Sequence, residues 1–342
     1  MIRMQPLTVG EATRTPGVRV HRMKELLKNQ TPHICVVRGE GLGDVITTTP
    51  TVAALKEQFP KSLITYATNT RYLGGALTKV LQYNPHLAQI IDRDNFKEND
   101  YDLVVNLHCP CIGYEKHENP PVSRIDIFAH HAGLRLSDPV PQYYIQKGEI
   151  LDGQKFLGPA MSDCLMMVQP TSSAQRRSLE HSKLKEAMMS LYEHAGVRSL
   201  IVTHSSDWTT NVIWNNIPGA IMVQDKDVRQ LAGIMAHCDL VLCPDSSIMH
   251  LAAAMNIPTV ALFGPTHPAA RINHYKNAVA IWGGEGINAC PCWYTACPVN
   301  TVCWSRITSE RIVQTCIQHL NQTSRINPAN LLKKSNIQTE IL

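Results

Sequence analysis

The feature that most constrains the fold is a regular alternation of short apolar runs with longer amphipathic stretches between residues 33 and 245. Short apolar runs rich in β-branched residues are typical of buried strands, whereas apolar residues spaced three to four positions apart are typical of helices. Strands and helices that alternate along a chain form parallel sheets with helical crossover connections. The sequence therefore predicts a protein of the α/β class.

The predicted elements fall into two series. The first series has helices at 51–59 and 125–131 and strands at 33–38, 63–67, 88–91 and 102–107. The second has helices at 183–193, 228–236, 249–255 and 310–319 and strands at 164–169, 199–203, 220–223, 239–243, 259–263 and 279–282. Between the two series, residues 146–163 contain three glycines and a proline and show little periodicity, which is typical of an interdomain linker.

A chain of 342 residues also fits two domains at about 150 residues each. We expect two doubly wound domains that face one another across a central cleft, where ligands of this architecture bind. The predicted boundaries are a loose N-terminal extension at 1–32, the N-terminal domain at 33–150, the linker at 151–163, the C-terminal domain at 164–322 and a C-terminal tail at 323–342.

Composition and charge exclude several classes of protein. Hydrophobic residues make up 44% of the chain and charged residues 18%, which excludes disorder for most of its length. The net charge is +4 and Lys and Arg form no block longer than a pair, so charge selects no nucleic-acid partner. The longest apolar stretch, 251–263, is too short for a membrane span, and the first thirty residues lack the apolar core of a secretory signal. We expect a cytoplasmic protein.

The first candidate for chemistry is the loop Gly39-Glu-Gly41-Leu-Gly43-Asp44, which follows a predicted strand. Its glycines allow a ligand to approach the backbone closely, and Asp44 is suited to act as a general base. The spacing is neither the dinucleotide fingerprint nor a Walker loop. A tight turn that Asp44 caps is the alternative interpretation.

The second candidate is the segment from Cys243 to His250, which also joins a strand to a helix. Asp245 ends the strand, Ser246 and Ser247 are good helix N-caps, and their hydroxyl and N–H groups would suit a diphosphate. Simple capping, with His250 partly buried, is the alternative. The chain continues into a further buried strand that ends in a Gly/Pro loop at the same edge of the sheet, which favours a functional role.

Five blocks of the sequence resemble glycosyltransferase family 9, the family of ADP-heptose:lipopolysaccharide heptosyltransferases. They occur in family order from about residue 38 to residue 313: RGEGLGDVITTTPTVAALKEQFP, DLVVNLH, RIDIFAHHAGL, PDSSIMHLAAAMNIPTVALFGPTHP and ACPCWYTACPVNTVCWSRITSERIV. The resemblance implies a GT-B fold, with an acceptor on the N-terminal Rossmann-like domain and a nucleotide-sugar donor on the C-terminal one. It also implies an inverting displacement in which the base removes the proton of the acceptor hydroxyl.

The resemblance assigns roles to particular residues. Asp44 corresponds to the catalytic base. Arg176 stands where the family has a lysine, and Ser247 where it usually has a glycine. The residues that correspond to the donor site are Thr171, Ser172, Arg176, Asp245, Ser246, Ser247, Met249 and His250. The candidates on the acceptor side are Gly43, Asn106, His108 and Arg124.

Several alternatives stay open at this point. The family's default acceptor is the inner core of lipopolysaccharide, which implies a glycan or lipopolysaccharide partner and peripheral contact with the inner face of the membrane. A protein, another glycan or a modified nucleobase are alternative acceptors. A sugar-nucleotide epimerase that shares the GT-B fold and a catalytically silent binding protein are alternative functions.

Cysteine is unusually frequent, with 11 residues, and four of these cluster at Cys290, Cys292, Cys297 and Cys303. Four thiolates are enough for a structural zinc or iron site, although the spacing is not that of common zinc modules. Free thiols packed in a loop are the alternative. The chemistry itself is expected to need no cofactor, and the triplets Asp92-Arg-Asp94 and Asp225-Lys-Asp227 are interpreted as caps and loops.

Overall fold

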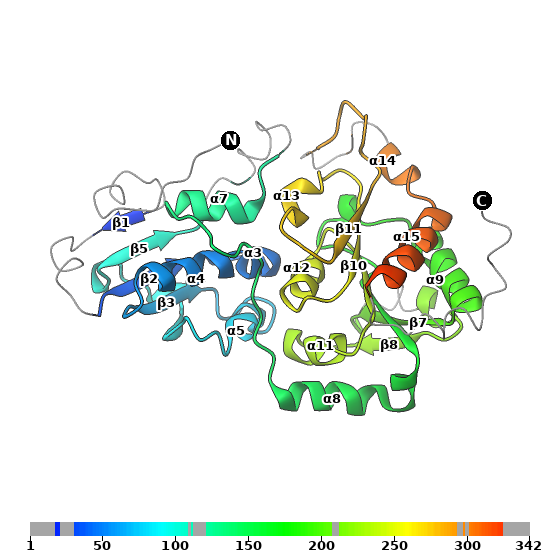
Figure 1. Ribbon diagram of the computed structural model, residues 1–342, viewed down its shortest axis with the longest axis horizontal. Helices are drawn as coiled ribbons and strands as arrows, with labels where there is room; N and C mark the ends of the chain where they lie inside the picture. Colours follow the sequence, from blue (N-terminus) through cyan, green and yellow to red (C-terminus); the bar gives the residue numbers. More distant parts are fainter. Residues whose placement is uncertain are drawn as a thin grey trace. The chain divides into compact units, whose positions relative to one another are not determined.

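A computed structural model describes residues 18–20, 31–108, 111, 121–206, 212–292, 297 and 301–323 (Figure 1). The chain divides into two compact units. Unit 1 comprises Met1–Tyr144 together with Ala269–His274, and unit 2 comprises Ile145–Pro268 together with Tyr275–Leu342. The short segment Ala269–His274 therefore belongs to unit 1, although the residues on either side of it in the sequence belong to unit 2.

The sheet of unit 1 has the strand order β1-β5-β2-β3-β4. Its strands are β1 (Val18–Val20), β2 (His33–Val37), β3 (Leu63–Thr68), β4 (Gln89–Asp92) and β5 (Leu103–Asn106). Strands β2 to β5 are parallel, as predicted, and β1 pairs antiparallel to β5. The extension at 1–32, which we expected to be loose, thus contributes a strand, because the edge of β5 offers backbone groups that require partners.

The helices of unit 1 are short. They are α3 (Leu42–Thr47), α4 (Thr49–Gln58), α5 (Ala76–Leu81), α7 (Arg124–His131) and α13 (Ala269–Ile272), with the 3₁₀ turns η1 (Arg93–Asn95) and η2 (Glu98–Asp100). The carboxylate of Asp92 accepts the Asp94 N–H and caps η1, which is the capping role predicted for this triplet. Helix α13 packs against α7.

The sheet of unit 2 is entirely parallel and has the order β11-β10-β9-β6-β7-β8. Its strands are β6 (Cys164–Val168), β7 (Val197–Thr203), β8 (Ile221–Gln224), β9 (Leu240–Pro244), β10 (Thr259–Phe263) and β11 (Ala278–Trp282). All six were predicted from their apolar runs. Strands β9 and β10 are buried over their whole length, because helices cover both faces of such sheets.

Two pairs of helices in unit 2 pack side by side, α9 with α15 and α8 with α11 (Figure 1). The helices and 3₁₀ turns are α8 (Lys147–Leu157), η3 (Gly158–Ser162), η4 (Gln175–Arg177), α9 (His181–Ala195), α11 (Val228–Met235), α12 (Ser247–Ala254), α14 (Val302–Ser305) and α15 (Ser309–Gln322). Asp227 caps α11 through the N–H groups of Arg229 and Gln230, again as predicted for its triplet.

Helix α8 corrects the interpretation of its segment as an aperiodic linker. The Gln146 N–H donates to the Glu149 carboxylate at 2.8 Å and starts the helix. A Cβ atom at Gly153 would lie 2.1 Å from the carbonyl oxygen of Gly233 in α11. This glycine is therefore needed for close packing between two helices, whereas we interpreted it as a sign of a flexible connection.

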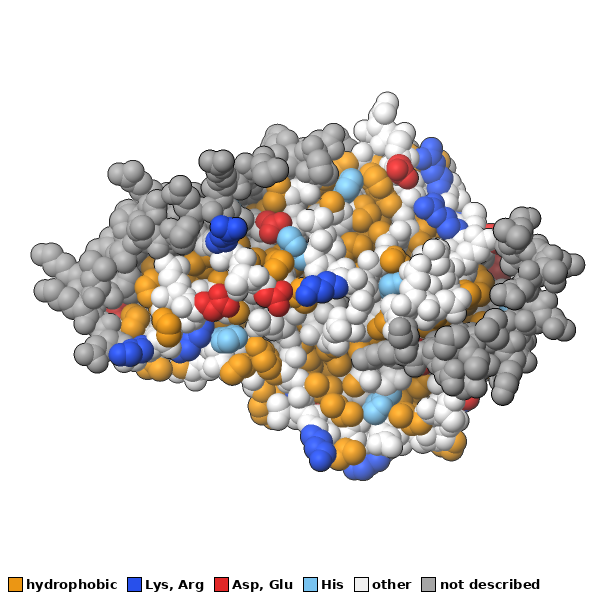
Figure 2. All heavy atoms as spheres, in the orientation of Figure 1, with side chains coloured by type: hydrophobic (Ala, Val, Ile, Leu, Met, Phe, Trp, Pro, Cys, Tyr) orange, Lys and Arg blue, Asp and Glu red, His pale blue; other side chains and the backbone are white. Residues whose placement is uncertain are grey.

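No helix among the described residues is both long enough and apolar enough to span a membrane. On the face shown in Figure 2, the described Lys and Arg side chains are scattered rather than gathered in one stripe. A basic stripe is the usual electrostatic footprint of a nucleic-acid-binding protein. The described residues visible in Figure 2 form no such stripe.

Candidate active site

In unit 1, the order of the strands reverses between β2 and β5, and ligands of doubly wound sheets bind at such a switch point. The loops that follow these two strands meet there. The Gly39 N–H donates to Nε2 of His108 at 2.9 Å, and the His108 N–H donates to Oδ1 of Asn106 at 3.0 Å. Asn106 and His108, predicted as acceptor contacts, therefore also shape the loop that leads to Asp44.

The hydrogen bond from Gly39 determines the form of His108. Because Nε2 accepts this bond, the proton of the neutral ring lies on Nδ1. Burial, followed by the positive charges of Arg38 and Arg93, lowers the pKa of His108 below its ordinary value. His108 is therefore uncharged at neutral pH and keeps its bond to the loop.

Asp44 lies in the first turn of helix α3, whereas we had expected it in a glycine loop. Gly41 caps this helix with a φ of 79°, and an added Cβ there would lie 2.7 Å from Oδ2 of Asp44. Only glycine combines this backbone conformation with so close an approach. Gly43 follows within the same helix, and Gly41 is the glycine whose conformation lets Asp44 approach the backbone.

Two arginines hold the carboxylate of Asp44. Nη2 of Arg38 lies 2.5 Å from Oδ2, and Nη1 of Arg124 lies 2.5 Å from Oδ1. The Asp44 side chain is 17% exposed, so these contacts are largely shielded from water. Arg124 was predicted as an acceptor contact, and in the structure it is a direct partner of the predicted base.

The pKa of Asp44 reflects two opposing effects. Burial alone would raise it, but the charges of Arg124, Arg38 and Arg271 outweigh burial and lower the pKa below its ordinary value. Asp44 is therefore ionised at neutral pH, which is the form that a general base requires.

Sequence reasoning missed Arg38 and Arg271 at this site. Arg38 directly follows β2, and its guanidinium also donates to the carbonyl of Leu107 at 3.2 Å and lies 5.5 Å from the centre of the Phe128 ring. The position of Arg38 just before the glycines was a usable signal. Arg271 lies in the segment that joins unit 1 from far along the chain, and no local pattern reveals this.

In unit 2, the strand order reverses between β6 and β9, and the predicted donor loops follow these two strands. The Ser172 hydroxyl donates to the backbone carbonyl of Asp245 at 2.9 Å and joins the two loops. Ser246 is the N-cap residue of α12 and Ser247 is its first residue. The free N–H groups and the positive end of α12 therefore lie beside Ser172.

Two further residues at this edge, Arg177 and Thr266, were not predicted as site residues. Asp245 is 2% exposed, and its carboxylate lies 3.3 Å from Nη1 of Arg177. Thr266 follows β10, the strand next to β9, and is 1% exposed. Its hydroxyl has no hydrogen-bond partner among the described residues. A buried hydroxyl without a partner is costly, and a ligand oxygen or a water would satisfy it.

The two remaining residues of the α12 motif are buried. Met249 is fully buried, so a contact between its side chain and a donor stays a prediction. His250 shares a hydrogen bond between its Nδ1 and the hydroxyl of Tyr275. Tyr275 lies near the start of β11. Its hydrogen bond limits how the imidazole of His250 can turn.

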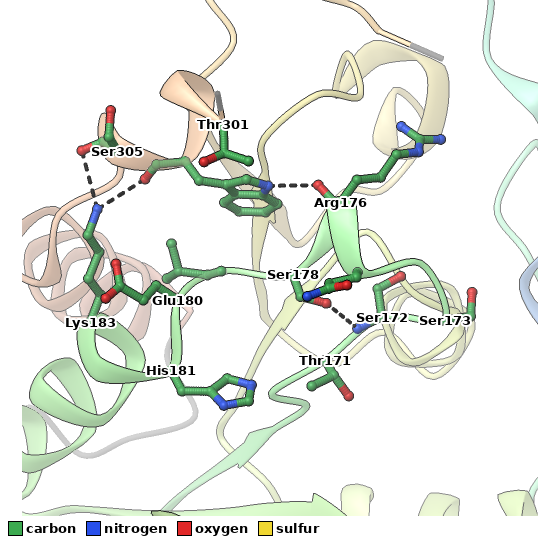
Figure 3. A pocket seen from close by; sticks show the side chains of 13 residues that line it. Thr171, Ser172, Ser173, Arg176, Ser178, Glu180, His181, Lys183, Thr301 and Ser305 are labelled. Carbon is green, nitrogen blue, oxygen red and sulfur yellow. Dashed lines mark hydrogen bonds between the residues drawn. The ribbon is translucent and has the colours of Figure 1, made fainter. Parts of the chain in front are cut away.

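A cavity of about 780 Å³ opens beside the loop after β6 (Figure 3). This volume is in the range of small-molecule sites. Thr171 and Ser172 line the cavity, together with the first turn of α9 and residues of α14. Nζ of Lys183 reaches the carbonyls of Trp304 and Ser305 at 3.2 and 3.3 Å.

Arg176 also belongs to the lining, but its side chain extends away from the other labelled residues in Figure 3. Its Nη1 donates to the carbonyl of Cys292 at 3.0 Å, and its own carbonyl accepts the Trp304 indole N–H at 2.8 Å. A contact between Arg176 and a donor phosphate stays a prediction.

The metal site at the four clustered cysteines stays a prediction. Among the described residues, no three side chains of His, Cys, Asp or Glu come together in a way that could hold a metal ion. The Sγ atom of Cys297 accepts the Thr301 N–H at 3.0 Å. Burial, followed by the neighbouring thiols of Cys303 and Cys292, raises the pKa of Cys290 to about 12. We therefore derive no step from zinc or iron.

Comparisons with known proteins identify a family and similar folds for this chain. The family description glycosyltransferase family 9 (heptosyltransferase) matches residues 114–302, which is more than half of the chain. A curated relative, lipooligosaccharide heptosyltransferase 2 of Campylobacter jejuni, is 28% identical over 100 residues. That match covers 29% of this chain and only 31% of the relative.

Solved structures of similar fold cover much more of the chain. The glycosyl transferase family 9 protein of Veillonella parvula is 18% identical, with a TM-score of 0.67 over 85% of this chain and 98% of that one. The ADP-heptose LPS heptosyltransferase II of E. coli is 15% identical, with a TM-score of 0.59 over 85% of this chain and 99% of that one. These likenesses confirm the predicted α/β class and GT-B fold.

Proposed function

Because this chain belongs to glycosyltransferase family 9, we propose that it moves a sugar from a nucleoside-diphosphate sugar to an acceptor hydroxyl. The donor we propose is ADP-heptose, since a structure of the same fold is described as an ADP-heptose LPS heptosyltransferase. The proposal assigns the donor to unit 2 and the acceptor to unit 1.

The observation that carries this proposal is the meeting of two loops at the switch point of unit 2. The hydrogen bond from Ser172 to the Asp245 carbonyl holds a hydroxyl-rich loop beside the N-terminus of α12. Helix N-termini bind phosphate groups through free N–H groups and the helix dipole. The buried hydroxyl of Thr266 and the cavity beside Thr171 and Ser172 support a ligand that is rich in oxygen atoms.

In the proposed reaction, the carboxylate of Asp44 takes the proton of the acceptor hydroxyl while the hydroxyl oxygen attacks the anomeric carbon. The bond from that carbon to the diphosphate breaks, and the nucleoside diphosphate leaves with the bonding electrons. Attack on the face opposite the leaving group inverts the configuration. The N–H groups at the start of α12 would stabilise the charge that grows on the departing diphosphate.

The acceptor we propose is the inner core of lipopolysaccharide, which the family resemblance implies, and the E. coli protein of the same fold is described as an LPS heptosyltransferase. Arg38 and Arg124 each pair with one oxygen of Asp44, and these oxygens have further lone pairs to which an acceptor hydroxyl could donate. We place this reaction in the cytoplasm. A lipid-anchored acceptor would bring the protein into peripheral contact with the inner face of the membrane.

The test measures the release of nucleoside diphosphate from ADP-heptose, with UDP-glucose and GDP-mannose as alternative donors, in the presence of lipopolysaccharide that lacks heptose. We expect release from ADP-heptose only with the acceptor present, together with a mass increase of one heptose on the acceptor. Interconversion of the donor without acceptor would instead indicate an epimerase. No turnover of any donor would contradict the proposal.

A further inference from the structure

The predicted donor site contains a buried acidic residue beside the helix N-terminus to which we assign the diphosphate. Asp245 directly follows β9 and directly precedes the N-cap residue of α12. Its side chain is 3% exposed, so water screens its charge poorly. A carboxylate in this position would repel the diphosphate that α12 attracts.

Arg177 provides the opposite charge. Its Nη1 lies 3.3 Å from Oδ2 of Asp245, and its own side chain is 22% exposed. The contact spans two neighbouring strands, because Arg177 follows β6 in η4 whereas Asp245 follows β9. The ion pair thus lies across the switch point at which we propose that the donor binds.

Local contacts hold Arg177 in this position. Its Nη2 donates to the hydroxyl of Ser173 at 3.0 Å, and its backbone N–H donates to the carbonyl of Ala174 at 2.8 Å. The neighbouring Arg176 is directed elsewhere, since its Nη1 donates to the carbonyl of Cys292. Of these two adjacent arginines, Arg177 is the one that contacts the α12 loop.

We propose that Arg177 is a positioning residue that neutralises Asp245, so that the N-terminus of α12 can accept the diphosphate of the donor. This inference rests on the proposed function, which assigns a nucleoside diphosphate to this site. The ion pair fixes the loop after β9 and cancels a charge that would oppose binding. Lysine supplies one point charge in place of the two guanidinium nitrogens that contact Asp245 and Ser173, so it would replace Arg177 only in part.

The test uses a charge cycle with ADP as the probe, measured by titration calorimetry on the full chain. Arg177→Ala should weaken ADP binding by about tenfold or more, because Asp245 then carries an uncompensated charge. Asp245→Asn alone should bind ADP at least as tightly as the unaltered chain. The double variant should recover most of the lost affinity, and Arg177→Lys should lose less than Arg177→Ala. A purely structural role predicts that Asp245→Asn and the double variant both bind worse.

Arg198→Ala is the matched control, because Arg198 forms an exposed ion pair with Asp163 elsewhere in unit 2 and should leave ADP affinity unchanged. If Arg177→Ala fails to fold, the Asp245→Asn result still decides, since weaker ADP binding there overturns the inference. Unchanged affinity in Arg177→Ala, or no recovery in the double variant, overturns it as well. If the unaltered chain binds no nucleoside diphosphate, the proposed function fails and this inference fails with it.

Discussion

Asp44 shows how a buried carboxylate can stay ionised. Its two oxygens face Arg38 and Arg124, and these charges lower its pKa although burial acts in the opposite direction. A carboxylate with a lowered pKa is a weak base. Proton transfer from the acceptor must therefore accompany the attack on the donor, since Asp44 would not hold the proton before bond formation begins.

Replacing Asp44 by asparagine tests its proposed role as the base. Asp44→Asn keeps the shape of the side chain but cannot take a proton, so we expect transfer to fall by about 10²- to 10⁴-fold. The affinity for ADP, measured by calorimetry, should stay roughly intact because the donor is assigned to unit 2. Asp94→Asn is the control, as this exposed carboxylate pairs with Arg71 on the surface of the same unit. Normal transfer by Asp44→Asn would disprove the mechanism.

The pH dependence of transfer tests the arginine contacts. Asp44 must be ionised to act, and its lowered pKa places the acidic limb of kcat/KM below the ordinary aspartate range. Arg124→Ala removes one of the charges that lower this pKa while burial continues to raise it. The acidic limb should therefore move to higher pH, whereas Arg71→Ala should leave it unchanged. A limb that stays in place in Arg124→Ala would mean that another group controls the profile.

The sequence pointed to Asp44 as a candidate, but it did not reveal that Arg124 contacts Asp44 directly. A glycine-rich turn after a strand is a local signal that points to the carboxylate. Arg124 lies 80 positions away and meets Asp44 only because the chain returns to the same edge of the sheet. Contacts of this kind depend on topology and on side-chain direction, and neither can be read from a local pattern.

At the scale of elements, strands were easier to predict than short helices. The inner strands β9 and β10 of unit 2 have nearly continuous apolar runs because they are buried on both faces. Helices such as α3, α5 and α13 have six residues or fewer, which is too short to show an amphipathic period. Helix α8 was missed for another reason, since its glycines suggested flexibility, whereas Gly153 permits close packing against α11.

Helix α8 provides a matched pair of glycines for a stability test. An added Cβ at Gly153 would meet the Gly233 carbonyl at 2.1 Å, whereas one at Gly148 would meet nothing within 4 Å. Gly153→Ala should force α8 and α11 apart and lower the free energy of unfolding by about 1–3 kcal/mol. Gly148→Ala should be neutral or stabilise by up to about 1 kcal/mol. Urea titrations measure both, and equal effects would show that α8 does not need the close approach.

The separation of α8 from α11 should also disturb an ion pair. Arg229 of α11 donates to the carboxylate of Glu149 of α8 from Nε at 2.6 Å and from Nη2 at 2.5 Å. Such paired contacts tolerate little displacement. We therefore expect Gly153→Ala and Arg229→Ala to be non-additive in a double-mutant cycle, since both act on the same helix contact.

At the scale of the whole molecule, the sequence predicted two domains. It did not predict that a short segment late in the chain belongs to the first of them. Residues 269–274 belong to unit 1, where Nε2 of His274 lies 2.8 Å from a carboxylate oxygen of Asp126. The neighbouring Tyr275 belongs to unit 2 and hydrogen-bonds His250 of the α12 motif. A four-residue helix without a strong period gives no local indication of the unit that it joins.

The division into two units predicts where a nucleotide should protect the backbone. A ligand that binds only the folded donor site stabilises it by about 2.7 kcal/mol at a hundredfold excess over Kd. Saturating ADP should therefore slow hydrogen exchange in the loop after β6 and at the start of α12, because both flank the switch point of unit 2. Exchange in α3, which carries Asp44, should change little, since ADP lacks the sugar and the acceptor.

Hydrogen exchange measured by mass spectrometry on peptides from both units would test this assignment. Stronger protection in α3 than in α12 would mean that the nucleotide binds unit 1, and the assignment of donor and acceptor to the two units would have to be reversed.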